Sequence, residues 1–254
     1  MITKRSFVLL RGLGRESRHW GRFATLLKEQ DFCAKIILCD LPGAGVFYKE
    51  PGHRTIAKIL DDMNRHYEEE LQASKPLAIL GFSLGGMLAL EYLCKSPDLF
   101  SELFLVNSSI GDLSPVYKRM RPSAARTLLK IAKSKDIAEK EQLILNLTSR
   151  NFRNDAELLR THIHIAETAP MSFSVLSQQV LAAARYSGPL HVPKKKGLVL
   201  YSKKDELVHP SCSLELARLL HIKAVGHEEA GHDLTLDDPQ WVLDRMTDFY
   251  KGLE

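Results

Sequence analysis

The chain has 254 residues, of which 44% are hydrophobic and 26% charged, and its formal net charge is +4. This composition is typical of a globular protein with a sizeable core and excludes an intrinsically disordered chain. The small basic excess forms no dense stripe, which argues against a nucleic-acid partner. No apolar run approaches the length of a membrane span or of a signal peptide's apolar region, so we expect a cytoplasmic protein without a membrane span.

Six short apolar runs, bounded by polar residues or glycine, predict buried parallel strands over residues 7–10, 34–39, 77–80, 103–106, 198–201 and 222–225. Segments with helical spacing alternate with the first four runs, over residues 20–30, 56–71 and 84–94. A further helix is expected after residues 237–239, through residue 249. This alternation predicts a parallel sheet covered by helices on both faces.

A long segment separates the fourth predicted strand from the fifth, and most of it has helical spacing rather than the composition of a loop. We expect residues 111–190 to form a helical cap, inserted into a core domain made of residues 1–110 and 191–254. Helices are expected within the cap over residues 126–133, 139–147, 155–168 and 172–184. Apolar cap side chains are expected to shape the substrate pocket, among them Leu143, Leu147 and Phe152.

A Gly-x-Ser-x-Gly motif runs from Gly81 to Gly85 with Ser83 at its centre, between the third predicted strand and the helix predicted to follow it. A serine on so sharp a turn needs neighbours without side chains, which explains the flanking glycines. The turn also directs the N-terminus of the helix at the reacting atom. We therefore expect Ser83 to be a nucleophile and the Leu84 N–H to be one donor of an oxyanion hole.

A serine hydroxyl is a weak nucleophile until a base accepts its proton, so a histidine is required near Ser83. Of the 10 histidines, His232 is the best placed because it follows an Ala-Gly pair shortly after the last predicted strand, and His227 in the same loop is the alternative. His162 and His164 lie two apart in a predicted helix. They therefore face different sides and make a poor metal pair.

The base needs an acid that fixes its tautomer and stabilises the imidazolium. Asp205 lies just past the fifth predicted strand, at the carboxyl edge where open α/β sheets build their sites. Glu206 and Asp112 remain alternatives, the second because it follows the fourth predicted strand. With Asp205, the order along the chain is serine, acid, histidine, which is the order that an α/β-hydrolase fold uses.

The loop after the first predicted strand is expected to supply the second oxyanion donor, the N–H of Leu13, because its glycines let the backbone turn toward Ser83. Arg11 begins this loop at the rim of the expected site. Its five N–H donors can brace neighbouring loops, bind an acidic group of the substrate, or face solvent. Bracing is the interpretation that we prefer.

With these residues collected, the chain resembles the α/β-hydrolase superfamily over essentially its whole length. The landmarks are FVLLRGLG at 7–14, DLPGAG at 40–45, GFSLGG at 81–86, KDELV at 204–208 and GHD at 231–233. The resemblance implies a mostly parallel sheet under a helical cap, where Ser83, Asp205 and His232 converge and hydrolyse a substrate through an acyl-enzyme without a metal or cofactor. In size and cap the chain is similar to small capped carboxylesterases, including the methyl-ester esterase of biotin synthesis.

Two features depart from this resemblance. Arg11 stands where the family usually has a histidine before the glycine of the oxyanion loop. The family usually begins with a β-hairpin, whereas the first predicted strand here starts almost at Met1. The sheet is therefore expected to be shortened to about six strands.

We expect a carboxylic-ester hydrolase acting on a small-molecule acyl ester. A thioesterase, an acyltransferase or a C–C bond hydrolase on the same triad remains an alternative, as does a non-catalytic protein that binds a small molecule. The predicted cap also carries a basic run without an acidic residue before Asp136. This run is either a solvated face or a docking patch for an acidic carrier protein or a phosphorylated substrate, and it comprises Lys118, Arg119, Arg121, Arg126, Lys130, Lys133 and Lys135.

Overall fold

A single six-stranded sheet forms the centre of the computed structural model, which describes residues 3–189 and 191–253. The strand order is β2-β1-β3-β4-β5-β6, and every neighbouring pair is parallel. All six predicted strands are confirmed, most of them with one or more additional residues. The strands are β1 (Arg5–Leu10), β2 (Cys33–Cys39), β3 (Leu77–Phe82), β4 (Phe100–Val106), β5 (Lys196–Ser202) and β6 (Lys223–His227).

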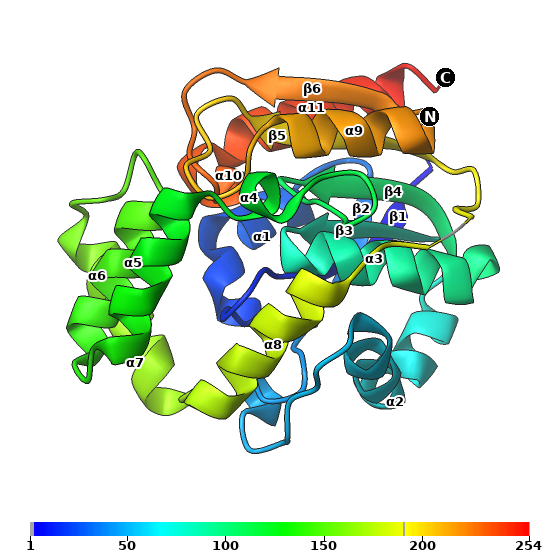
Figure 1. Ribbon diagram of the computed structural model, residues 1–254. Coiled ribbons are helices and arrows are strands. Elements are labelled where there is room, and N and C mark those ends of the chain that lie inside the picture. The colour runs from blue at the N-terminus through cyan, green and yellow to red at the C-terminus, as the bar shows by residue number, and fades with distance from the viewer. Residues whose placement is uncertain (1–2, 190, 254) are drawn as a thin grey trace.

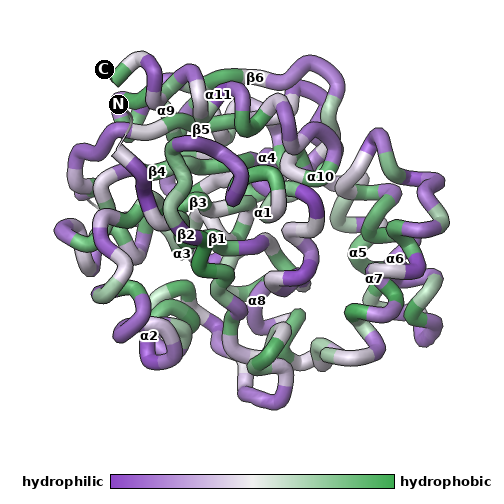
Figure 2. The backbone as a smooth tube through the Cα atoms, turned by 180° about the vertical axis from the view of Figure 1, so that it is seen from behind, coloured by the Kyte–Doolittle hydropathy of each residue, from purple (hydrophilic) through white to green (hydrophobic). Residues whose placement is uncertain are grey.

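The continuous apolar runs in the sequence follow from burial of the sheet on both faces. In β1, Val8 and Leu10 join one hydrophobic cluster, whereas Phe7 and Leu9 join the cluster on the opposite face. Successive side chains of a strand point to opposite faces, so a strand covered on both sides needs an apolar residue at every position. Figure 2 shows much hydrophobic colour along the central strands, whereas the helices alternate between hydrophobic and hydrophilic colour.

Helices cover both faces of the sheet (Figure 1). The first cluster packs the sheet against α2 (Ile56–Ala73), α3 (Leu84–Lys95) and α9 (Ser211–Leu220). The second packs it against α1 (Gly21–Lys28) and α11 (Pro239–Lys251). Four of these helices match the sequence prediction, whereas α9 is a short helix that the sequence reading missed.

The segment between β4 and β5 is helical, as predicted. In Figure 1, α5, α6 and α7 form a group beside the sheet, and α8 returns from this group toward it. Helix α5 packs on α6, and α6 packs on α7. The helices are α4 (Val116–Arg119), α5 (Pro122–Lys133), α6 (Ile137–Thr148), α7 (Ala156–Thr168) and α8 (Phe173–Arg185). The division into a cap and a core domain stays a prediction, and its boundary residue 190 lies outside the described residues, as do residues 1, 2 and 254.

Four short elements complete the chain: η1 (Ser17–Trp20), η2 (Gly45–Phe47), η3 (Pro97–Leu99) and α10 (Leu234–Asp237). The first follows β1 and the last follows β6, so both lie in connections at the carboxyl edge of the sheet. Within residues 3–189 and 191–253, no helix combines the length and the apolar character needed to cross a membrane.

The turn from β3 into α3 depends on glycines because three backbone segments meet there. A Cβ atom on Gly85 would collide with the carbonyl oxygen of Leu10 at the end of β1. A Cβ atom on Gly81 would collide with the carbonyl oxygen of Gly85. Backbone atoms cannot move aside as the end of a flexible side chain can, so these two positions exclude larger residues.

Gly85→Ala is expected to lower the free energy of unfolding by about 1–3 kcal/mol, because the added methyl group displaces the end of β1. Gly252→Ala is the matched control, since the nearest atom to an added Cβ there is 3.4 Å away. Urea unfolding of both variants measures the difference. Equal stability of the two variants would show that the turn tolerates a side chain.

Candidate active site

Ser83 occupies the turn between β3 and α3 with a φ of 54°, a conformation that is strained for any residue with a side chain. Its backbone is held on both sides by β4 and the loop that follows. The Ser83 N–H donates to the Val106 carbonyl at 2.9 Å, and the Ser108 hydroxyl donates to the Ser83 carbonyl at 2.8 Å. The turn is therefore fixed with the hydroxyl group at the carboxyl edge of the sheet.

His232 and Asp205 form a hydrogen-bonded chain with Ser83. The Nε2 atom of His232 lies 3.0 Å from the Ser83 Oγ atom, and its Nδ1 atom lies 2.7 Å from the Asp205 Oδ2 atom. The other carboxylate oxygen of Asp205 accepts the N–H groups of Leu207 and Val208 at 2.8 and 2.9 Å. With Nδ1 donating to the carboxylate, Nε2 is free to accept a proton from the serine.

The alternative acid and base residues have other contacts. His227 binds Asp238 through Nε2 at 3.2 Å, and its Nδ1 atom accepts backbone N–H groups of its own loop. Glu206 pairs with Arg150 at 3.3 Å and with Arg153 at 2.8 Å. Asp112 is exposed. The geometry therefore brings His232 and Asp205 to the serine, and none of these three alternatives.

The two expected oxyanion donors lie beside Ser83. Leu84 is the first residue of α3, where a backbone N–H has no partner within its own helix. The loop before Leu13 passes so close that a Cβ atom on Gly12 would lie 3.2 Å from the Cβ atom of Ser83. Leu13 and Leu84 both line the cavity next to the serine. Their role as oxyanion donors stays a prediction.

A contact that the sequence did not reveal holds the loop of Leu13. The Gly14 N–H donates to the side-chain oxygen of Gln179 at 3.0 Å, and Gln179 belongs to α8. The two residues are 165 positions apart in the chain, so no local pattern signals this hydrogen bond. Helix α8 is thereby attached to the loop that carries Leu13.

Arg11 is buried, with 2% of its surface exposed, and it is not part of the cavity wall. Its Nη2 atom lies 2.5 Å from the Asp233 Oδ2 atom, and its Nη1 atom donates to the Thr235 hydroxyl at 3.2 Å. The guanidinium carbon lies 4.7 and 4.9 Å from the ring centres of Trp20 and Phe82. This placement corrects the expectation that Arg11 contacts the substrate, and it agrees with the bracing interpretation.

The Arg11–Asp233 pair connects the parts of the site. Arg11 precedes the loop of Leu13, and Asp233 directly follows His232. Burial alone would raise the pKa of Asp233, but the charge and hydrogen bonds of Arg11 hold this pKa below its ordinary value. The pair is therefore ionised, and it ties the histidine loop to the end of β1.

Asn107 is a second residue that the sequence reading missed. It follows β4 with a φ of 46°, and its side-chain nitrogen donates to the His232 carbonyl at 2.6 Å. Its side-chain oxygen accepts the Ser202 N–H at 2.8 Å. A polar residue directly after a buried strand, at the carboxyl edge of the sheet, is the signal that could have identified it.

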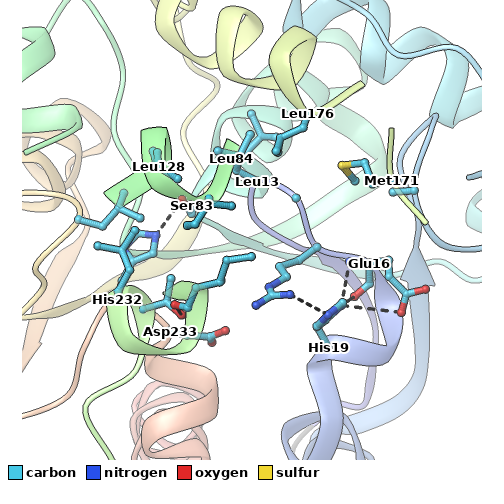
Figure 3. A pocket seen from close by; sticks show the side chains of 18 of the residues that line it. Leu13, Glu16, His19, Ser83, Leu84, Leu128, Met171, Leu176, His232 and Asp233 are labelled. Carbon is cyan, nitrogen blue, oxygen red and sulfur yellow. Dashed lines mark hydrogen bonds and ion pairs between the residues drawn. The ribbon is translucent and has the colours of Figure 1, made fainter. Parts of the chain in front are cut away.

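A cavity of about 440 Å³ opens next to Ser83 and His232 (Figure 3). Leu147 lines it, whereas Leu143 on α6 and Phe152 in the connection between α6 and α7 lie outside its wall, against the expectation for these two. That Leu147 shapes a substrate pocket stays a prediction. Most of the wall is apolar, including Leu13, Met87, Leu128, Ile131, Ile137, Ile144, Ile165, Met171 and Leu176.

The chain matches the model of the alpha/beta hydrolase family over residues 7–245. The chain belongs to this family. No curated protein sequence matches it at a significant level. An esterase from Exiguobacterium antarcticum superposes with a TM-score of 0.80 at 18% identity, covering 99% of this chain and 93% of that one.

Two further solved structures share the alpha/beta hydrolase fold. The esterase RhEst1 from Rhodococcus sp. ECU1013 has a TM-score of 0.77 at 19% identity, covering 100% of this chain and 94% of its own. The enol-lactonase from Burkholderia xenovorans LB400 has a TM-score of 0.77 at 16% identity, covering 98% and 92%. At these sequence identities, the similarity to the three solved structures shows a shared fold and nothing further.

Arg11→Met is expected to lower the free energy of unfolding at neutral pH by about 3–5 kcal/mol, because Asp233 stays buried without its counter-charge. The lowered pKa of Asp233 stabilises the wild type above the carboxyl's unfolded pKa of about 3.9, and that stabilisation is lost as pH falls through the lower folded pKa. In the variant, burial raises the pKa of Asp233 against only the weaker effects of Thr235 and His232, so acid favours folding.

The stability difference between wild type and Arg11→Met should therefore shrink as the pH falls from about 7 toward 4. Urea unfolding at several pH values measures it. A difference that stays constant over this range would mean that Arg11 stabilises the fold through packing on Trp20 and Phe82 rather than through its charge.

Proposed function

We propose that the chain is a serine hydrolase that cleaves a carboxylic ester through an acyl-enzyme. Ser83 is the nucleophile, His232 the general base and Asp205 the acid that orients the base. The observation that carries this proposal is the continuous hydrogen-bonded chain from Asp205 through His232 to Ser83, at 2.7 and 3.0 Å. Membership of the alpha/beta hydrolase family and the esterases among the structures of the same fold support it.

In the first half of the reaction, the Ser83 oxygen attacks the acyl carbon while His232 Nε2 takes its proton. The substrate's carbonyl oxygen becomes an oxyanion, and the N–H groups of Leu13 and Leu84 donate to it. The intermediate then collapses and expels the alcohol, which takes the proton from His232. The serine is left acylated.

The second half repeats these steps with water as the nucleophile. His232 accepts a proton from the water as it attacks the acyl carbon, and the proton then passes to the Ser83 oxygen as the acid leaves. Asp205 stays ionised throughout and stabilises the imidazolium. Asn107 and the Arg11–Asp233 pair hold the loop of His232 in place beside Ser83. In this proposal the helices of the cap, residues 111–190, enclose the acyl chain.

Thioester cleavage, acyl transfer and C–C bond hydrolysis would use the same three side chains. A non-catalytic binding protein would not use them in a reaction. The short contacts of His232 to both partners favour a working nucleophile over simple binding, because a binding pocket has no need for this alignment. The mostly apolar cavity wall favours an uncharged ester whose acyl chain is largely, but not wholly, apolar.

Ser83→Ala is expected to reduce hydrolysis of short-chain p-nitrophenyl esters by at least about 10³-fold, since it removes the attacking oxygen. The urea midpoint should stay close to that of the wild type. Ser109→Ala, which removes another hydroxyl from the wall of the same cavity, is the matched control and should retain most activity. Labelling by a fluorophosphonate should likewise require Ser83. More than a few per cent of residual activity in a folded Ser83→Ala protein would contradict the mechanism.

We also propose that the basic run of the cap docks an acidic carrier protein that presents the acyl group. Arg126, Lys130 and Lys133 are exposed on α5, and their spacing places them on one face of the helix. Lys118 and Arg119 have internal partners: Lys118 pairs with Glu215 at 3.7 Å, and Arg119 donates to carbonyls of α8. The docking face is therefore centred on α5.

Binding of an acidic acyl-carrier protein is expected to weaken steeply when ionic strength rises from about 0.01 M to 1 M, which shortens the screening length from about 30 Å to about 3 Å. Reversing the charge of Arg126, Lys130 and Lys133 to glutamate should abolish it. The control reverses three exposed charges on α1 and α11: Arg22, Lys28 and Lys251. Surface plasmon resonance measures both, and equal effects of the two triple variants would show that only net charge matters.

A further inference from the structure

A second group of polar side chains lies in the wall of the cavity, away from Ser83 and His232. Figure 3 shows Glu16 and His19 across the cavity from Ser83, with apolar side chains such as Leu13 on the wall between them. Arg15 and Glu141 line the same region. We call Arg15, His19, Glu141 and His162 the polar cluster. All four are buried, with at most 9% of each residue exposed.

The polar cluster joins the loop after β1 to two helices of the segment between β4 and β5. The Nη1 atom of Arg15 donates to Glu141 Oε2 of α6 at 2.6 Å and to His19 Nε2 at 3.1 Å. The ring of His162, on α7, packs edge-on against His19 with 5.0 Å between the ring centres. Both ring nitrogens of His19 have partners: Nε2 faces the Arg15 guanidinium, and Nδ1 lies 3.2 Å from the Glu16 backbone nitrogen and 3.3 Å from the Glu16 carbonyl oxygen.

The polar cluster carries no net charge at neutral pH. Burial, followed by the charge of Arg15, lowers the pKa of His19 well below its ordinary value, and the same two causes lower the pKa of His162 to about 3. Both imidazoles are therefore uncharged, and the charges of Arg15 and Glu141 cancel. A carboxylate entering this region would meet Glu141, and an ammonium group would meet Arg15.

Hydrogen-bonding capacity remains unused in the polar cluster. Arg15 has five N–H donors, and both of its described bonds use Nη1. Its Nε and Nη2 atoms, like Glu141 Oε1, have no hydrogen-bond partner among the described residues, and both side chains belong to residues that line the cavity. A free donor and a free acceptor lie on two side chains that are themselves hydrogen-bonded.

The geometry does not favour a metal ion in the polar cluster. His19, Glu141 and His162 offer ligand atoms within 4.8 Å of one another, a spacing that a divalent cation could use. The Arg15 guanidinium, however, already contacts two of these three side chains, at 2.6 and 3.1 Å. A cation in this position would have to displace a buried positive charge from its carboxylate partner.

We propose that the polar cluster is a second binding subsite, which recognises an uncharged hydrogen-bonding group, a hydroxyl or an amide, on the acyl chain of the substrate. The inference rests on the proposed ester hydrolysis at Ser83. A hydroxyl can accept from Arg15 and donate to Glu141 at once, which matches both free positions. A plain alkyl chain would displace water from Arg15 and Glu141 without replacing the hydrogen bonds of that water, which lowers affinity.

The test compares p-nitrophenyl esters whose acyl chains end in a hydroxyl with esters whose chains end in a methyl group at the same position. Chains of about six to ten carbons suit a cavity of this size. Binding is measured on Ser83→Ala, which cannot cleave the ester, and kcat/KM on the wild type. The hydroxyl ester of at least one length is expected to bind about tenfold or more tightly than its methyl partner, with a similar ratio in kcat/KM.

Two cluster variants, each made in the wild-type and Ser83→Ala backgrounds, locate the effect. Arg15→Met/Glu141→Leu removes both free groups without leaving a lone buried charge, and the preference for the hydroxyl should disappear. Glu141→Gln keeps the shape but leaves Arg15 uncompensated, so an ester ending in a carboxylate should gain affinity relative to the hydroxyl ester. Arg22→Met is the control, because Arg22 is exposed on α1 and does not line the cavity.

Equal binding of hydroxyl and methyl esters at every length would overturn the subsite, as would a preference that survives Arg15→Met/Glu141→Leu. Tightest binding of the carboxylate ester to the unmodified cluster would overturn its assignment to an uncharged group. The proposed ester hydrolysis is tested separately. If the protein binds the hydroxyl ester more tightly but shows no turnover that depends on Ser83, the subsite is supported and the proposed hydrolysis is contradicted.

Discussion

The buried ion pair between Arg11 and Asp233 is the interaction on which the geometry of the candidate site most depends. One partner ends the first strand and precedes the loop of Leu13, and the other is the neighbour of His232 in sequence. The rings of Trp20 and Phe82 exclude water from the guanidinium, and Phe82 is also the residue before Ser83. A single side chain thus contacts or adjoins the segments that carry Ser83, His232 and Leu13.

Arg11 stands where the family usually has a histidine, and the two side chains differ in the number of hydrogen bonds they can donate. An imidazole offers two nitrogen atoms, whereas the Arg11 guanidinium binds both oxygens of Asp233 and the hydroxyl of Thr235. The polar cluster uses the same chemistry in the wall of the cavity, where Arg15 binds Glu141 and His19. In both places a carboxylate and one further acceptor replace part of the water that the buried arginine loses.

Much of the fold could be predicted because its signals are local. The strand runs and the Gly81–Gly85 motif each reflect one segment's burial or turn geometry, and the order of the landmarks then fixed the family. Contacts between distant segments could not be predicted in this way. Arg15 and Glu141 are 126 positions apart, and no pattern in either segment refers to the other. Helix α9 was missed although its buried residues Cys212, Leu216, Ala217 and Leu220 recur at helical spacing.

The hydrogen bond between Gly14 and Gln179 has a mechanical consequence for entry into the cavity. Gln179 lies on α8, which also lines the cavity through Leu176. If α8 moves outward to admit a substrate, it must either pull the loop of Leu13 with it or release the Gly14 N–H. The position of the loop of Leu13 is thereby coupled to the position of α8.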